Sequence, residues 1–259
     1  ENQEIGNTLN VDPLLKVNSD GTFTFKTNGQ FDPLAVGEQT DISFNYQMKD
    51  AEGLTSNATV TLTITGVNDA PIVKDMMITT DEDSAKNGTK FSGDDIDTDD
   101  NQASLKYTIV DDLLATEGVV TNKGTTFDYN PNGKFESLAV GETATVDFTY
   151  KAMDQHGVYS SIQTVTINIT GVNDAPVAQD MMIMTDEDTT NKGTKFDAND
   201  IDSDDDQTTL VYSIVTGLSP SEGTVTIKGN AFDYDPNGKF EYLAVGEDTS
   251  VSFTYRGKD

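Results

Sequence analysis

The 259-residue sequence contains no cysteine, no tryptophan and a single histidine, His156. Without cysteine the chain can form neither disulfide bonds nor thiolate metal sites, and one histidine does not supply the ligand set of a zinc or copper centre. No window approaches 18 apolar residues, so we expect no membrane insertion. The sequence shows no basic and apolar leader and begins and ends abruptly, so we expect it to be part of a longer protein.

Positive charge is also scarce, because 16 Lys and Arg stand against 45 Asp and Glu, for a formal net charge of −29. This balance excludes sequence-independent binding of nucleic acid or of an anionic membrane, since both require positive charge. It favours cation partners, or a surface kept soluble by self-repulsion. Aspartate supplies 33 of the acids and glutamate 12, and aspartate is a frequent ligand of hard cations as well as a turn residue.

An internal repeat dominates the sequence. The segment Gly-Val-Asn-Asp-Ala-Pro at 66–71 returns at 171–176, and 54 of 89 positions are identical when 66–154 is aligned on 171–259 without gaps. The segment 31–38 matches later copies in the same way, so the chain before residue 66 is the back half of another copy. We therefore predict a partial first repeat (1–65), a complete second repeat (66–170) and a third repeat that lacks its C-terminal strand (171–259).

Each copy has the pattern of short β-strands. Residues 164–170, 146–150 and 104–109 alternate polar and apolar side chains, as half-buried strands do. Gly, Pro, Asn and Asp separate these runs. About seven strands in roughly 100 residues is the size of an immunoglobulin-like sandwich, and a period of 105 residues is too long for a β-solenoid.

The acids are clustered rather than spread. In the second repeat they fall in five places, which are the linker (68–69), two runs (81–83 and 94–100), a position after a turn (Glu142) and a strand end (Asp154). Most of these positions are acidic in the third repeat as well. Five like charges within seven residues repel one another unless a cation joins them. The Asp-x-Asp-x-Asp spacing and an all-oxygen ligand set favour Ca²⁺ over Mg²⁺. A solvated acidic loop that serves solubility remains the alternative.

Three segments carry a resemblance to a known family. The segment Phe-Asp-Tyr-Asn-Pro-Asn-Gly at 127–133, the Leu-Ala-Val-Gly-Glu turn and the strand and linker at 165–176 resemble VCBS and bacterial cadherin-like repeats. The resemblance covers essentially the whole chain, and the Thr-Gly-x-Asn-Asp-Ala-Pro junction is its most specific part. It implies an all-β chain of tandem immunoglobulin/cadherin-like β-sandwich domains, of the kind found in the stalks of large RTX-type bacterial adhesins.

The likeness to cadherins also implies ligand sets, because a cadherin junction binds Ca²⁺ with acids of the upstream domain, the linker and the downstream domain. For the first junction it implies Glu38, Asn68, Asp69, Asp97, Asp99 and Asp154. For the second junction it implies Glu82, Glu142, Asn173, Asp174, Asp202, Asp204 and Asp259.

The linkers depart from the cadherin pattern. Gly66 and Gly171 stand where the cadherin linker begins with Asp, and Ala70 and Ala175 stand where it ends with Asn. This implies weaker binding, fewer ions, or compensation by neighbouring acids, namely Asp83, Asp95, Asp188 and Asp200. Asp94, Asp100 and Asp206 are alternatively the parts of a separate site within one domain.

We therefore expect a calcium-rigidified extender of a bacterial cell-surface adhesin, located outside the cell, whose partners are Ca²⁺ and the neighbouring repeats. Carbohydrate-binding domains or accessory spacer domains of a secreted protein are the alternative. Sugar platforms need exposed aromatic side chains, whereas Tyr129, Tyr150, Tyr212 and Tyr234 fall on strand patterns and are predicted to pack in the core.

Two further expectations concern catalysis and self-association. We expect no enzyme, because His156 has no repeated Ser or Asp constellation around it and the carboxylate pairs recur as a metal pattern does. A sheet that lacks a strand exposes an edge, so head-to-tail strand donation between chains is an alternative to simple truncation at the two ends.

Overall fold

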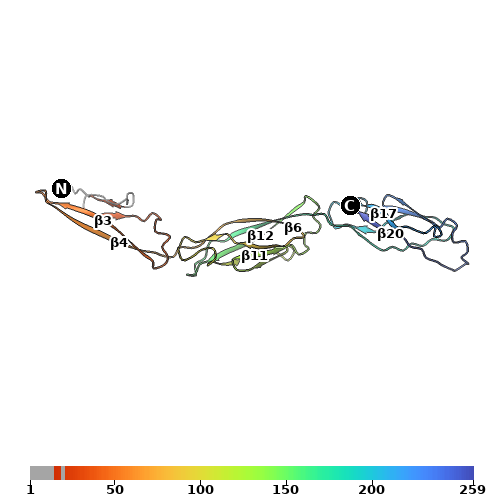
Figure 1. Cartoon of the computed structure of the whole chain (residues 1–259), viewed down its shortest axis with the longest axis horizontal. Helices are drawn as coiled ribbons and strands as arrows, with labels where there is room; N and C mark the ends of the chain where they lie inside the picture. Colours follow the sequence, from red (N-terminus) through yellow and green to blue (C-terminus); the bar gives the residue numbers. More distant parts are fainter. Residues whose placement is uncertain (1–14, 19–20) are drawn as a thin grey trace.

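The computed structural model describes residues 15–18 and 21–259, and every regular element in these ranges is a β-strand. The all-β class is thus confirmed, while the beginning of the first repeat lies outside the described residues. Figure 1 shows the three repeats end to end in an extended row. Among the described residues there is no helix with the length and apolar character needed to cross a membrane.

The first repeat contributes two antiparallel hairpins. Its strands are β1 (Leu15–Val17), β2 (Phe23–Phe25), β3 (Gln39–Lys49) and β4 (Thr55–Thr65). β1 pairs with β2, and β3 pairs with β4 over its whole length, from Gln39 opposite Thr65 to Lys49 opposite Thr55. The hairpin of β3 and β4 leads directly into the first linker.

The second repeat forms two sheets around one core. Its strands are β5 (Ile72–Val73), β6 (Met76–Asp81), β7 (Lys86–Lys90), β8 (Gly93–Asp94), β9 (Lys106–Ile109), β10 (Val119–Asn122), β11 (Thr126–Asn130), β12 (Thr143–Met153) and β13 (Gln163–Thr170). One sheet has the order β6-β13-β12-β9 and the other β10-β11-β7, while β5 pairs with β8 beside the linker. β13 is one of the two inner strands of the larger sheet, parallel to β6 and antiparallel to β12.

The core of the second repeat explains why these runs become strands. Val165, Ile167 and Ile169 of β13 are all fully buried, as the period-two pattern of this segment predicts. Phe91, which directly follows β7, and Tyr107 of β9 stack with their ring centroids 4.9 Å apart. The sandwich is thus closed by side chains that alternate along each strand.

The prediction that Tyr129, Tyr150, Tyr212 and Tyr234 pack in the core is confirmed, because none of them is more than 7% exposed. The hydroxyl group of Tyr129 donates a hydrogen bond to the carbonyl oxygen of Glu117 at 3.0 Å. These rings are therefore not available as a flat platform for sugars.

The third repeat keeps only part of this architecture. Its strands are β14 (Val177–Ala178), β15 (Asn191–Lys195), β16 (Ala198–Asn199), β17 (Val211–Thr216), β18 (Thr224–Lys228), β19 (Ala231–Asp235) and β20 (Thr254–Lys258). No residue of this repeat aligns with β13. The segments aligned with β6 and with the first half of β12, residues 181–186 and 248–253, are not strands, because the strand that pairs with both in the second repeat has no counterpart here.

Candidate metal centre

The first junction joins the linker to two loops of the second repeat. The amide nitrogen Nδ2 of Asn68 donates a hydrogen bond to Asp154, which follows β12, at 2.8 Å. The backbone N–H of Asp69 donates to Oδ2 of Asp97, in the loop between β8 and β9, at 2.8 Å. The N–H of Asp97 in turn donates to Oδ1 of Asp95 at 3.1 Å. The carboxylates of one repeat are thus fixed on the linker that enters it.

The second junction is built in the same way from the aligned residues. Asn173 donates from Nδ2 to Asp259, and the N–H of Asp174 donates to Oδ2 of Asp202 at 2.9 Å. The N–H of Asp202 donates to Oδ1 of Asp200 at 3.1 Å. Because two separate segments of the chain adopt one arrangement, the geometry belongs to the repeat itself.

Several oxygen atoms at the junctions are buried and accept no hydrogen bond from the described protein groups. At the first junction they are Asn68 Oδ1, Asp95 Oδ2 and Asp97 Oδ1. At the second junction they are Asp81 Oδ1, Glu82 Oε2, Asp174 Oδ2, Asp200 Oδ2 and Asp202 Oδ1. A buried carboxylate oxygen without a partner has lost its hydration and gained nothing in return, so a cluster of them indicates a place for a cation.

Glu82, Asp174 and Asp202 form the tightest group of acids at the second junction. Each offers one carboxylate oxygen, and these three atoms lie within 4.8 Å of one another. Glu82 comes from the second repeat, Asp174 from the linker and Asp202 from the third repeat. Glu82 and Asp202 are only 1% and 4% exposed. A cation held by this group would touch all three segments at once.

The electrostatics of the junctions favour the same conclusion. Burial raises the pKa of the Glu82 carboxyl despite a hydrogen bond from the N–H of Val172, and the charge of Asp174 raises it further. Burial also raises the pKa of Asp174, and Asp202 adds to this by repulsion. At the first junction the pKa of Asp69 is raised by burial and then by Asp97. Without a cation, the negative charges at both junctions are therefore held at unfavourable positions.

No lysine of the described chain neutralises these acids. Lysine ion pairs occur at Asp128 and Asp233, which lie on β11 and β19 away from the junctions. Among the described residues, the one ion pair that involves an expected junction acid is that of Asp99 with His156, which depends on the protonation of the histidine.

Hydrogen bonds also cross each junction directly. The hydroxyl of Thr98 donates to Oε2 of Glu38 at 3.1 Å, and the N–H of Thr98 donates to the carbonyl oxygen of Pro33 at 3.1 Å. At the second junction Ser203, which aligns with Thr98, donates to Oε2 of Glu142 at 2.6 Å. The structure thus brings Glu38 and Glu142 to the junctions, and in each the oxygen Oε2 already accepts a hydrogen bond from the next repeat.

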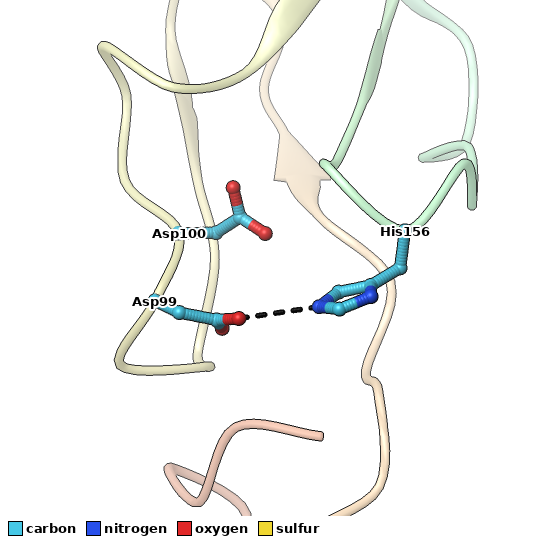
Figure 2. A group of neighbouring side chains, drawn as sticks. All are labelled: Asp99, Asp100 and His156. Carbon is cyan, nitrogen blue, oxygen red and sulfur yellow. Dashed lines mark hydrogen bonds and ion pairs between the residues drawn. The ribbon is translucent and has the colours of Figure 1, made fainter. Parts of the chain in front are cut away.

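Asp99 and Asp204 are exposed, and among the hydrogen bonds of the described residues neither side chain contacts a linker or the preceding repeat. Oδ2 of Asp99 lies 3.1 Å from Nε2 of His156, on the side of the loop that faces the turn after β12 (Figure 2). The linker contacts of the same loop are made by Asp97 instead. Whether Asp99 and Asp204 bind metal at the junctions stays a prediction.

Some acids at the junctions were not in the expected ligand sets. Asp95 and Asp200 were expected only as compensating neighbours, yet each has a buried oxygen without a partner. Burial raises the pKa of Glu136, with further repulsion from Asp83, while Asp32 contributes to the raised pKa of Asp69. The signal was present in the sequence, since an acid follows a phenylalanine at positions 32, 136 and 241.

Gly66 and Gly171 explain one departure from the cadherin pattern. A Cβ atom at Gly171 would lie 2.2 Å from the carbonyl oxygen of Leu138 and 2.3 Å from that of Ala139. A Cβ atom at Gly66 would lie equally close to two carbonyl oxygens of the aligned turn. Each strand therefore ends against the Leu-Ala-Val-Gly-Glu turn at a distance that only glycine permits, and an aspartate does not fit there.

The comparisons with known proteins agree with this architecture. The family model of the bacterial cadherin-like domain matches residues 68–171, and the family model of the bacterial Ig domain matches residues 3–63 and 173–259. A search of curated proteins finds no match.

Solved cadherin ectodomains resemble the chain at low sequence identity. Domains EC1-3 of mouse protocadherin-24 are 14% identical, with a TM-score of 0.49 over 90% of this chain and 76% of that chain. Domains EC1-4 of Drosophila N-cadherin are 16% identical, with a TM-score of 0.38 over 86% of this chain and 55% of that chain. Domains EC1-2 of chicken VE-cadherin are 17% identical, with a TM-score of 0.34 over 62% of this chain and 79% of that chain.

The family matches define the class of protein. The chain belongs to the bacterial cadherin-like and bacterial Ig-like repeat domains. Such domains are typically extracellular modules with structural or adhesive roles and without enzymatic activity.

Proposed function

We propose that both junctions bind Ca²⁺ and that the bound ions hold consecutive repeats in a straight rod. The observation that carries this proposal is the group of Glu82, Asp174 and Asp202, in which three chain segments aim carboxylates at one place. Cadherin-like domains generally bind calcium, which supports the choice of ion.

The chemistry of the donors fits Ca²⁺. The ion takes six to eight oxygen ligands at about 2.3–2.6 Å, so its ligand atoms lie up to about 5 Å apart. The three oxygen atoms of the tight group fall within 4.8 Å of one another, and further unpartnered oxygens come from Asp81 and Asp200. Mg²⁺ demands a smaller and more regular octahedron, which this irregular set of side chains matches less well.

The mechanical effect follows from where the ligands come from. Repeats joined by a short linker bend freely unless an interface holds them. The direct hydrogen bonds between Ser203 and Glu142, and between Thr98 and Glu38, are made at exposed side chains. They contribute little against bending, because water competes for such groups. An ion that binds both repeats and the linker removes this freedom.

A rigid row of repeats suits a stalk. We infer that the chain is an extender of a bacterial cell-surface adhesin, which projects a distal adhesive domain away from the cell. The repeat architecture, the all-β fold and the strongly negative surface support this role, because an array of like-charged modules resists collapse onto itself.

Calcium removal tests the proposal. Thermal unfolding and small-angle X-ray scattering would be measured with Ca²⁺, with EDTA, and with Mg²⁺ at matched ionic strength. At a free Ca²⁺ concentration tenfold above the dissociation constant, each site should add roughly 1.4 kcal/mol to the free energy of unfolding. We expect a higher melting temperature and a narrower distribution of end-to-end distances with Ca²⁺ alone. Equal melting temperatures and equal scattering in EDTA and Ca²⁺ would refute the proposal.

A further inference from the structure

Two loops of the second repeat bring the only histidine of the chain against two aspartates. His156 lies in the turn between β12 and β13, and Asp99 and Asp100 lie in the loop between β8 and β9. Figure 2 shows the two carboxylates and the imidazole ring facing one another across the space between the loops. One ligand atom from each residue, including a ring nitrogen of His156, lies within 4.8 Å of the other two.

Hydrogen bonds hold both loops in this position. The N–H of Val158 donates to Oδ1 of Asp154 at 2.8 Å, which closes the turn that carries His156. The side-chain amide of Gln155 donates to the carbonyl oxygen of Asp99 at 3.1 Å, and the hydroxyl of Ser104 donates to Oδ1 of Asp100 at 2.7 Å. The two loops and the Asp100 carboxylate are thus held by other contacts, while the His156 ring and the Asp99 carboxylate contact each other.

The ligand chemistry differs from that of the junctions. Ca²⁺ prefers oxygen donors, whereas imidazole suits Zn²⁺, Cu²⁺, Ni²⁺ and related ions. Zn²⁺ binds histidine nitrogen and carboxylate oxygen at about 2.0–2.2 Å, so tetrahedral ligands lie about 3.4 Å apart. The 3.1 Å separation of Asp99 Oδ2 and His156 Nε2 is close to this value. One histidine alone does not make a metal site, but the carboxylates of Asp99 and Asp100 complete a set of three ligands. The sequence analysis did not predict that these three residues meet.

The first repeat does not carry the same group of ligands, because Glu52 occupies the position aligned with His156. The cluster is also separate from the linker contacts of the first junction, which are made by Asp97 and Asp154. A metal ion here would tie the loop before β9 to the turn after β12 inside one repeat.

We propose that His156, Asp99 and Asp100 form a binding site for a divalent transition-metal ion of the Zn²⁺ class, distinct from the calcium sites, so that Asp99 serves this site and not the first junction. The side chains of His156 and Asp99 are 34% and 33% exposed, so the ion is open to solvent and to a further ligand. Asp100 is only 5% exposed and provides the inner wall of the site. The site fastens the two loops that carry ligands of the first junction.

Zinc binding to calcium-saturated protein tests this proposal. The lone histidine gives a direct probe, because its two ring-proton NMR signals belong to His156 and to no other residue. We expect Zn²⁺ to shift these signals at one equivalent per chain, and excess Ca²⁺ to leave them unchanged. Calorimetric titration of Zn²⁺ should give at least about tenfold weaker binding in His156→Gln, since even outer contacts of a metal site affect affinity by 10–100-fold.

Matched variants distinguish this site from the junctions. Glu52→Gln, at the aligned position of the first repeat, should leave zinc binding unchanged. His156→Gln should leave the response of the melting temperature to Ca²⁺ unchanged, so that failure of the zinc site and failure of the calcium sites are separate outcomes. Zinc binding of equal affinity in wild type and His156→Gln, with unshifted imidazole signals, would show zinc held by carboxylates only and would overturn the proposal.

Discussion

Glu82 directly follows β6 in the second repeat, and its Oε1 accepts a hydrogen bond from the backbone N–H of Val172 in the second linker at 2.8 Å. Its other carboxylate oxygen is buried and has no hydrogen-bond partner. A side chain with 1% exposure is thus fixed on the linker by one oxygen, and its carboxylate lies beside those of Asp174 and Asp202.

Glu82→Gln should weaken calcium binding at the second junction. The amide keeps an oxygen to accept the hydrogen bond from Val172 but removes one ligand charge, so we expect at least about tenfold weaker Ca²⁺ binding. In EDTA the same variant should melt at a higher temperature than wild type, because a buried charge beside Asp174 is gone. Calorimetric titration and thermal unfolding measure the two effects.

Glu187→Gln is the matched control, because Glu187 aligns with Glu82 but lies outside the group of acids at the second junction. This variant should leave both the calcium affinity and the melting temperature in EDTA unchanged. A Glu82→Gln protein that binds calcium as wild type does would contradict the assignment of Glu82 as a ligand.

Much of this arrangement could be predicted from the sequence. Alternation along residues 164–170 predicted β13, and the resemblance to cadherins implied that the acids that recur in two copies meet at the junctions. The repeat pattern and this resemblance therefore predicted both the β-sandwich fold and the clustering of acids at the junctions between repeats. Loop conformation could not be predicted in the same way.

The orientation of individual carboxylates depends on loop conformation. Among the acids of 94–100, Asp97 accepts a hydrogen bond from the linker and Asp95 accepts one from the N–H of Asp97, while Asp99 turns toward His156. The spacing of these residues alone does not distinguish them, because the choice is made by backbone hydrogen bonds within the loop. The close approach at Gly171 was likewise not visible in the sequence, since it depends on where the Leu-Ala-Val-Gly-Glu turn lies.

Gly171→Ala should destabilise the second repeat. A Cβ atom would lie 2.2 Å from the carbonyl oxygen of Leu138, so strand or turn must shift, at a cost of about 1–3 kcal/mol in the free energy of unfolding. The shift should also weaken calcium binding at the second junction, because Gly171 leads directly into Asn173 and Asp174. Urea unfolding and calcium titration test both effects.

Gly217→Ala provides the comparison for that variant. Only one side-chain atom, of Ile214, lies within 4.0 Å of the Cβ position at Gly217, so alanine fits there. Stability equal to or slightly above wild type is expected, because alanine restricts the unfolded chain. Equal stability of Gly171→Ala and wild type would show that the contact with the turn is not required.

The stability of the metal-free protein should fall as the pH rises. Burial raises the pKa of Glu82 and of Asp174, so in the window from about 4 up to their raised pKa values the folded chain binds more protons than the unfolded chain. Their protonation at lower pH therefore stabilises the fold. Asp154 acts in the opposite direction at still lower pH, because hydrogen bonds from Asn68 and from the N–H of Val158 outweigh its burial and lower its pKa.

Calcium should reverse this dependence, since a bound cation favours the charged carboxylates and protons compete with it. Melting temperatures measured across this pH range should rise on acidification in EDTA and fall on acidification in Ca²⁺. Glu82→Gln should reduce the slope in EDTA. Parallel pH profiles in EDTA and Ca²⁺ would show that these carboxylates do not meet a cation.

Asp200→Asn should weaken calcium binding more than Asp204→Asn. Asp200 is 7% exposed, has a buried oxygen without a partner and holds the N–H of Asp202 through its other oxygen. Asp204 is exposed, although the cadherin pattern assigns it as a ligand. The Asp200→Asn variant keeps an oxygen that accepts the hydrogen bond from the N–H of Asp202 and loses only the charge. The melting temperature of this variant in EDTA should therefore not fall. Calcium titration compares the calcium affinities of the two variants. A larger loss of affinity in Asp204→Asn would contradict the prediction and would mean that the loop rearranges around the ion to follow the cadherin pattern.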